Sequence, residues 1–185
     1  MATSIAAMPQ VQRRLVHTRS IRFEAYQRED RLWDFVASVQ DVKTRDFPLE
    51  NGTRSAGDPF HDMRITVTID ATMTIVAVEA VTIAAPFMGS CDAFSQAYQK
   101  LVGLNLMLRF RAAVRERVGG NQGCTHVSEL AALLPTVAIQ AFSGEMPRPD
   151  RGPDAMPLQL DRCHALRLDG PVVARLYPRW YINKD

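Results

Sequence analysis

Residues 57–103 read GDPFHDMRITVTID (57–70), ATMTIVAVEAVTIAAPFMGSC (71–91) and DAFSQAYQKLVG (92–103), and they decide the fold. Apolar and polar residues alternate from Met63 to Asp70, which is typical of a half-buried strand because successive side chains point to opposite faces. Residues 75–83 are almost wholly apolar or β-branched, and the short connection between the two runs suits a hairpin. Helical spacing then runs from Cys91 to a stop at Gly103, with Ser90 as the expected cap.

A second hairpin and two further helices complete the predicted fold. Polarity alternates over residues 16–28, residues 27–30 form a turn, and apolar side chains return at every second position from Trp33 to Val39. Helical spacing recurs over residues 104–118 and after Cys124. We therefore expect an α+β domain whose antiparallel sheet is built from two hairpins, with all three helices packed on one face.

The length of 185 residues suits one domain with an ordered tail. We expect a single α+β domain over residues 14–145. Four prolines fall within residues 146–157, which predicts a linker. The C-terminal extension, residues 158–185, contains a short strand candidate at residues 172–176.

Composition excludes several classes of partner. The net charge is +2, from 22 basic and 20 acidic residues without a lysine-rich block, so nucleic-acid binding has no support. No apolar run is long enough to span a bilayer. Three widely spaced cysteines do not make a disulfide framework, and we therefore expect a cytoplasmic protein.

In the hairpin of residues 16–39, the alternate positions that carry apolar side chains are continued at one end by ionisable side chains. If the chain turns near Glu29, His17 and Arg19 lie across from the region of Asp41 and Lys43. Two interpretations are open. The cluster is either a solvated rim where the core ends, or the wall of a pocket in which neighbouring charges tune groups for acid–base work. In a pocket, Arg19 or Lys43 would hold a phenolate, and His17 or Asp41 would move a proton.

The pocket interpretation predicts a set of site residues. An apolar face with aromatic side chains and a few polar groups suits a small aromatic ligand. The predicted catalytic residues are His17, Arg19, Asp41, Lys43 and His61. The predicted substrate contacts are Tyr26, Trp33, Phe35 and Arg45.

Cysteines and histidines offer a second interpretation, because both are metal-ligand types. Cys91 and Cys124 each precede a predicted helix, whose dipole favours a thiolate. Lone buried cysteines are, however, most often small hydrophobic residues, and no CxxC or HxxxH spacing occurs here. The predicted metal ligands are Asp58, Cys91, Cys124 and His126, with His61 as a further candidate and zinc or iron as the ion.

Short motifs over most of the chain are specific in combination: His17-Thr-Arg19, Tyr26-Gln-Arg28, Asp30 to Trp33, Asp41-Val-Lys43, Pro59-Phe-His-Asp-Met63, Cys91, Leu101-Val-Gly103 and Gly123-Cys-Thr-His126. Together they resemble a bacterial family, Domain of Unknown Function 2889. The chain departs from the family pattern at Arg31, where a glycine is favoured, and at Val42, where a threonine is favoured. The resemblance implies a catabolic setting in bacteria that degrade aromatic and fatty-acid compounds.

Residues 57–142 are similar, more remotely, to the NifU-like iron–sulfur scaffold proteins, which hold a cluster or zinc on three cysteines and an aspartate. Asp58, Cys91 and Cys124 match three of those positions. Ala56 stands where the scaffold family has its first cysteine. This resemblance implies a NifU-like middle of the chain and a metal or iron–sulfur carrier, which is a non-enzymatic class.

The function expected first is that of a cytoplasmic catabolic enzyme, a lyase or another acid–base enzyme acting on a small aromatic substrate such as a lignin-type phenolic or an aromatic acyl compound. The alternative is the metal or iron–sulfur carrier. The expected partner is a small aromatic molecule, with neither nucleic acid nor a membrane. A homodimer is a further possibility, and the sequence does not determine the oligomeric state.

Overall fold

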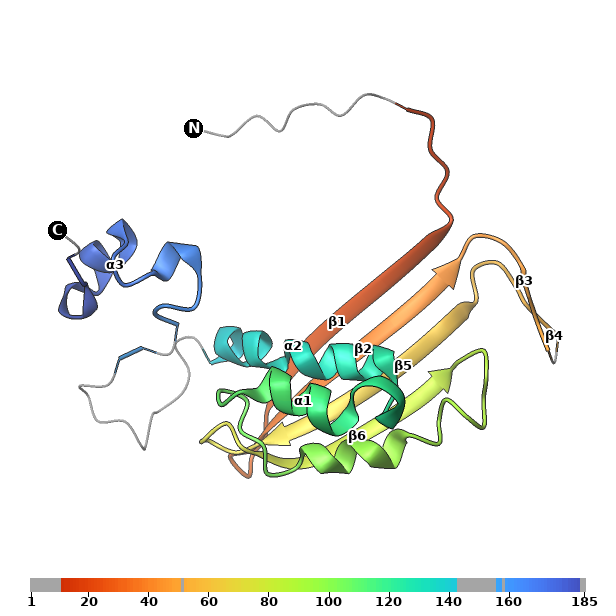
Figure 1. The fold of residues 1–185 in the computed structure, drawn as a ribbon, viewed down its shortest axis with the longest axis horizontal. Coiled ribbons are helices and arrows are strands. Elements are labelled where there is room, and N and C mark those ends of the chain that lie inside the picture. The colour runs from red at the N-terminus through yellow and green to blue at the C-terminus, as the bar shows by residue number, and fades with distance from the viewer. Residues whose placement is uncertain (1–10, 51, 143–155, 158, 184–185) are drawn as a thin grey trace.

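The computed structural model describes residues 11–50, 52–142, 156–157 and 159–183. Its main body is an antiparallel sheet in the order β1-β2-β5-β6, with helices over one face (Figure 1). The fold is therefore of the expected α+β class, and the two predicted hairpins share one sheet. The strands of this sheet are β1 (His17–Gln27), β2 (Trp33–Lys43), β5 (Pro59–Ile69) and β6 (Ile75–Ala84).

The connection between β2 and β5 carries a small hairpin of its own. Its strands are β3 (Phe47–Leu49) and β4 (Gly52–Arg54). The turn between β5 and β6 has the predicted hairpin form, because Asp70 Oδ1 accepts hydrogen bonds from the backbone N–H groups of Thr72 and Thr74.

The core lies between the sheet and the helices. Phe35, Ala37, Ile65 and Val67 occupy alternate positions of β2 and β5, and all four are fully buried. Each large apolar side chain taken out of water contributes about 1.5–3 kcal/mol, so this face fixes which side of the sheet the helices cover. The other face of the same strands is more exposed.

The helical segments that cover this face are η1 (Ser95–Leu101), α1 (Phe110–Val118), η2 (Gly120–Gln122) and α2 (Thr125–Ala141). Apolar side chains from α1 and α2 recur at helical spacing and are buried against the sheet. Gly103 and Gly119 end η1 and α1, as the sequence predicted.

The prediction of a helix beginning at Cys91 was wrong. The chain forms a turn there, and only a short 3₁₀ helix follows, without a side-chain cap. Asp92 Oδ1 accepts a hydrogen bond from the backbone N–H of Gly89, and the N–H groups of Ser90 and Cys91 both donate to the Phe87 carbonyl. These bonds close a turn, so neither Ser90 nor Asp92 caps a helix.

The prediction of a helix from Leu104 was also wrong over its first residues. The backbone N–H groups of Gly103 and Leu106 donate to the carbonyls of Ile75 and Met73, and Ile75 donates to Leu104. Pairing with the start of β6 therefore holds this segment extended. Helix α1 begins only after Arg109, whose φ is 49°.

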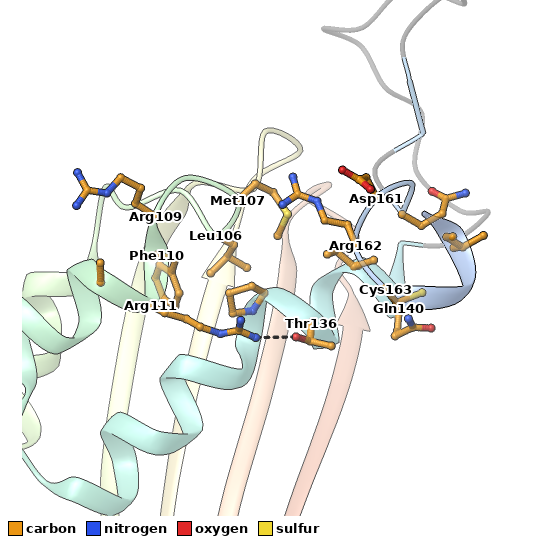
Figure 2. Close-up of a pocket in the computed structure, with 15 residues that line it drawn as sticks. Leu106, Met107, Arg109, Phe110, Arg111, Thr136, Gln140, Asp161, Arg162 and Cys163 are labelled. Carbon is orange, nitrogen blue, oxygen red and sulfur yellow. Dashed lines mark hydrogen bonds between the residues drawn. The ribbon is translucent and has the colours of Figure 1, made fainter. Parts of the chain in front are cut away.

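Helix α2 continues through Pro135. A proline cannot donate its backbone nitrogen to the preceding turn. Arg111 supplies donors beside it, to the Ala132 carbonyl and to Thr136 Oγ1, each at 3.0 Å. Figure 2 shows the bond to Thr136.

The described part of the C-terminal extension contains η3 (His164–Leu166), α3 (Pro171–Leu176) and η4 (Pro178–Trp180). The strand predicted at residues 172–176 was wrong. Pro171 stands at the first position of α3, where its fixed φ and missing N–H favour a helix start. Of the predicted linker, only residues 156 and 157 are described, so most of that prediction lies outside the described residues. No helix among the described residues has the length and apolarity required to cross a membrane.

Candidate functional site

A row of three ionisable side chains crosses the sheet. Arg19 on β1 is paired with Asp41 on β2, and Asp41 is paired in turn with His61 on β5. Paired positions on neighbouring strands share a face, and Asp41 continues the buried alternation of β2. The three side chains therefore lie on the helix-covered face, at the end of the sheet where the apolar core stops.

The Asp41 carboxylate is the centre of this row and is only 3% exposed. Its Oδ1 accepts hydrogen bonds from His17 Nε2 at 2.8 Å and Arg19 Nε at 2.9 Å. Its Oδ2 accepts from Arg19 Nη2 at 2.9 Å and His61 Nδ1 at 3.0 Å. The sequence thus predicted correctly that His17 and Arg19 lie near Asp41, and the structure adds His61 to that group.

Helix α2 brings a third histidine to the same carboxylate. His126 lies in the first turn of α2, with Nε2 3.6 Å from Asp41 Oδ2 and its ring centroid 4.1 Å from that of His61. We call His17, Arg19, Asp41, His61 and His126 the Asp41 cluster.

The first turn of α2 is held in place by Tyr98 of η1. Cys124 is the residue before the helix, and Tyr98 Oη donates to its carbonyl at 2.8 Å and accepts from its N–H at 3.0 Å. Ser128 Oγ donates to the Val118 carbonyl at 2.7 Å. These contacts fix the position from which His126 reaches the sheet.

The electrostatics of Asp41 are dominated by Arg19. The hydrogen-bonded guanidinium, against the effect of burial and with help from His17, holds the pKa of the Asp41 carboxyl well below its usual range. Asp41 is consequently a fixed anion at neutral pH. Of the two groups expected to move a proton, this favours His17 over Asp41.

The pKa values of His61 and His126 are shifted in opposite directions. Burial, together with the charge of His126, lowers the pKa of His61. A hydrogen bond to Cys124, at 3.8 Å from Nδ1 to Sγ, raises the pKa of His126 despite burial. Burial alone would raise the pKa of the Cys124 thiol, but His126 and backbone N–H groups lower it. Cys124 and His126 therefore form a coupled pair beside Asp41.

Lys43 lies at the rim of the Asp41 cluster, paired with His17 across β1 and β2. Its Nζ is 4.8 Å from the Phe60 ring centroid and 5.2 Å from that of Phe47. The Phe60 ring also meets the His61 ring edge-on at 5.0 Å. These two phenylalanines, which were not among the predicted substrate contacts, are the aromatic rings near the cluster.

Three of the four predicted substrate contacts lie away from Asp41. Tyr26 and Trp33 are at the opposite end of the β1–β2 hairpin from His17 and Lys43. Trp33 and Phe35 are buried in the core, edge-on to Phe142. The fourth, Arg45, is exposed in the segment that follows Lys43 at the end of β2.

The predicted metal ligands are only partly gathered. Cys91 and Cys124 border one narrow space with Tyr98 and Val127, and His126 lies beside Cys124. Asp58 is exposed in the turn before β5. Among the described residues, the group whose ligand atoms all lie within 4.8 Å of one another is Asp41, His61 and His126. Each of these residues was a candidate from the sequence, but their combination was not predicted, because it depends on the register between β2 and β5 and on the position of α2.

A cavity of about 580 Å³ lies between α1, α2 and residues 159–166 (Figure 2). Arg109, Arg111 and Arg162 line it, and no member of the Asp41 cluster does. Arg111 is already bonded to α2, as described above.

Comparison with known proteins gives one match. A family model described as "Protein of unknown function (DUF2889)" matches residues 17–140, a range that contains the whole sheet and the Asp41 cluster. No curated protein matches the chain, and no solved structure matches it. The expected similarity to NifU-like scaffold proteins has no support from these comparisons.

Proposed function

We propose that this chain, which belongs to the DUF2889 family, is an acid–base enzyme in which His17 moves a proton on a small aromatic substrate. The observation that carries the proposal is the contact between His17 and Asp41. The Asp41 carboxylate, kept ionised by Arg19, accepts a hydrogen bond from His17 Nε2 at 2.8 Å. This fixes the tautomer of the imidazole and leaves Nδ1 with its lone pair, as a general base requires.

The position of His17 suits contact with a substrate. Its side chain is 41% exposed, whereas that of Asp41 is 4% exposed. The buried carboxylate orients the imidazole and balances the charge that the ring gains when it takes up a proton. A water-accessible base held by a buried anion is the arrangement expected of a catalytic dyad, which supports the pocket interpretation of this cluster.

The rim supports an aromatic anion as the substrate. Lys43 is the cross-strand neighbour of His17, and its ammonium group stacks over the rings of Phe47 and Phe60. A phenolate or carboxylate can pair with Lys43 while the substrate ring packs against Phe60. Arg19 is less suited to this role, because Asp41 and Glu129 already occupy its donors.

A lyase step fits these groups. His17 Nδ1 would take a proton from the substrate, the electron pair of that bond would form a new double bond, and the leaving group would depart with its own electron pair. Lys43 would stabilise negative charge on the aromatic ring oxygen. The cytoplasmic setting that we propose is consistent with Cys91, Cys124 and Cys163 all being free thiols.

The test is a screen of the purified chain for turnover and binding of lignin-type phenolics and aromatic acyl thioesters. We expect turnover of at least one of them. We also expect His17→Gln to lower kcat/KM about a hundredfold, because general-base catalysis typically accelerates a reaction 10²–10⁴-fold. His164→Gln, a change on η3 of the C-terminal extension, is the matched control and should keep the wild-type rate. No turnover and no binding in the screen, or full activity of His17→Gln, would contradict the proposal.

A further inference from the structure

We infer that Asp41, His61 and His126 together bind one divalent transition-metal ion. The inference goes beyond the proposed reaction, because it concerns the inner side of the Asp41 cluster and not His17 or Lys43. Metal binding can also be measured without any substrate, so failure of one proposal leaves the other standing.

The three side chains converge on one point. Asp41 Oδ2 is 3.0 Å from His61 Nδ1 and 3.6 Å from His126 Nε2. Two ligands on one tetrahedral ion, with bonds of 2.0–2.2 Å, are separated by about 3.3–3.6 Å. The shorter of the two distances lies below this range and the longer lies at its upper end. All three ligand atoms lie within 4.8 Å of one another, so side-chain movements would bring them onto one ion.

The orientation of His126 also suits a metal ligand. Its Nδ1 lies 3.8 Å from Cys124 Sγ, and its Nε2 is the nitrogen that faces Asp41 Oδ2, at 3.6 Å. Without an ion, a proton on Nε2 can lie between these two atoms. A divalent ion would take the place of that proton, because metal binding displaces protons from its ligands.

Contacts around these three residues hold the ligand atoms in place. Arg19 donates to both oxygens of the Asp41 carboxylate and His17 donates to Oδ1, and these bonds fix the orientation in which Oδ2 meets the two imidazoles. The contact of Cys124 Sγ with Nδ1 orients the His126 ring. Such supporting contacts fix the orientation and tautomer of metal ligands in known sites. His61 gives up the Nδ1 proton that it now donates to Asp41, as metal binding generally displaces protons.

The ligand set identifies the class of ion. Two imidazoles and one carboxylate, with coordination positions left for water or substrate, suit zinc(II) or iron(II) better than magnesium or calcium, which prefer oxygen ligands. The side chains of His61 and His126 are 18% and 20% exposed, so the ion can reach them from solvent. Of the metal ligands predicted from the sequence, His126 and the further candidate His61 belong to this set, and Asp58, Cys91 and Cys124 do not.

The experiment uses the full chain without a histidine tag, stripped with a chelator and titrated by calorimetry with zinc(II) and, without oxygen, with iron(II). We expect one equivalent of one of these ions to bind. His61→Gln and His126→Gln should each weaken binding about a hundredfold, since loss of a supporting contact alone costs 10–100-fold. His164→Gln should bind as the wild type does.

Cobalt(II) provides a second readout. With nitrogen and oxygen ligands its visible bands should appear without a sulfur-to-metal charge-transfer band, because Cys124 supports His126 and does not bind the ion. A charge-transfer band that disappears in Cys124→Ser would overturn the assigned ligand set. The site itself would be overturned by affinities weaker than about 1 mM for both zinc(II) and iron(II). Wild-type affinity in His61→Gln and His126→Gln, each shown by circular dichroism to be folded, would overturn it as well.

Discussion

At the scale of the residue, Asp41 is the group on which the others depend. It is a buried carboxylate with charged or polar donors on both oxygens, and a buried charge of this kind is tolerated only when it is fully paired. Arg19 is the main partner, because it donates to both oxygens at 2.9 Å. The orientation of His17 and His61 follows from where that guanidinium holds the carboxylate.

Replacing Arg19 should therefore reduce stability as well as activity. In Arg19→Gln two charge-assisted hydrogen bonds to a buried carboxylate are lost, and hydrogen bonds to charged groups contribute about 1.5–3 kcal/mol. Because Arg19 is partly exposed, we expect the lower part of that range. The measurement is the free energy of unfolding in urea. Arg22→Gln on the same strand is the control, since Arg22 bonds only to exposed Glu24, and equal losses in the two variants would contradict the role of Arg19.

Lys43 is the residue whose replacement should affect activity without affecting the fold. Its ammonium group packs on the outer rings of Phe47 and Phe60 and not on Asp41. With a substrate found by the screen, Lys43→Ala should lower kcat/KM at least tenfold, which is about 1.4 kcal/mol in the barrier. Lys100→Ala, on η1, is the control for loss of a lysine charge. An unchanged kcat/KM in Lys43→Ala would remove Lys43 from the substrate site.

At the scale of the element, the site depends on how α2 is attached to the sheet. Only its first residues carry side chains that reach Asp41, and Tyr98 binds the backbone just before them. Tyr98 is itself buried at 1% exposure. A disturbance of η1 should therefore reach His126 through Cys124, although η1 contributes no side chain to the cluster.

Tyr98→Phe tests this connection. The substitution keeps the ring but leaves the Cys124 N–H without its acceptor, and a buried unsatisfied donor costs about 1–3 kcal/mol. We expect a loss of that size in the free energy of unfolding, together with weaker metal binding. Tyr181→Phe, which removes an exposed hydroxyl, should change neither quantity. If Tyr98→Phe were as stable as the wild type, the hydrogen bonds of Tyr98 would not be what holds α2.

Tyr98 also gives a pH dependence with a defined sign. Burial raises its pKa above the ordinary value of 10.0. As pH rises past about 10, the unfolded chain loses this proton while the folded chain keeps it, so the folded state loses stability. The loss continues until the pH passes the pKa of the folded state. Urea unfolding between pH 9 and pH 11 should show a steeper decline for the wild type than for Tyr98→Phe. Parallel declines would contradict this assignment.

The same scale shows what the sequence could and could not predict. Alternation alone identified the strands and placed His17 and Arg19 near Asp41, because a hairpin turn sets that register. The pairing of Asp41 with His61 depends on the register between β2 and β5, which are joined by residues 44–58 and a small hairpin. Nothing local in the sequence fixes that register. The turn at Gly89 depends on a hydrogen bond to the Asp92 side chain, which competes with helix capping. The residues after Gly103 are extended because they pair with the start of β6, which is distant in sequence.

At the scale of the whole molecule, the matched family region and the hydrophobic core nearly coincide. The family match ends at residue 140, and the core cluster ends at Phe142, whose ring packs edge-on against Trp33 and Phe35. Leu160 and Val173 are buried in the C-terminal extension, but neither belongs to that core cluster. The fold and the Asp41 cluster should therefore not require the residues after Phe142.

A chain ending at Phe142 tests this division. Since every member of the core cluster and of the Asp41 cluster is retained, we expect a cooperative thermal transition and metal affinity within about threefold of the full chain, that is about 0.7 kcal/mol. The matched variant is Phe142→Ala in the full chain, which removes a ring that is 6% exposed and should cost about 3 kcal/mol. Calorimetry of both proteins separates the two contributions. If the shortened chain failed to fold while Phe142→Ala remained stable, the C-terminal extension would be part of the domain, and the cavity that it shares with α1 and α2 would be part of its interior.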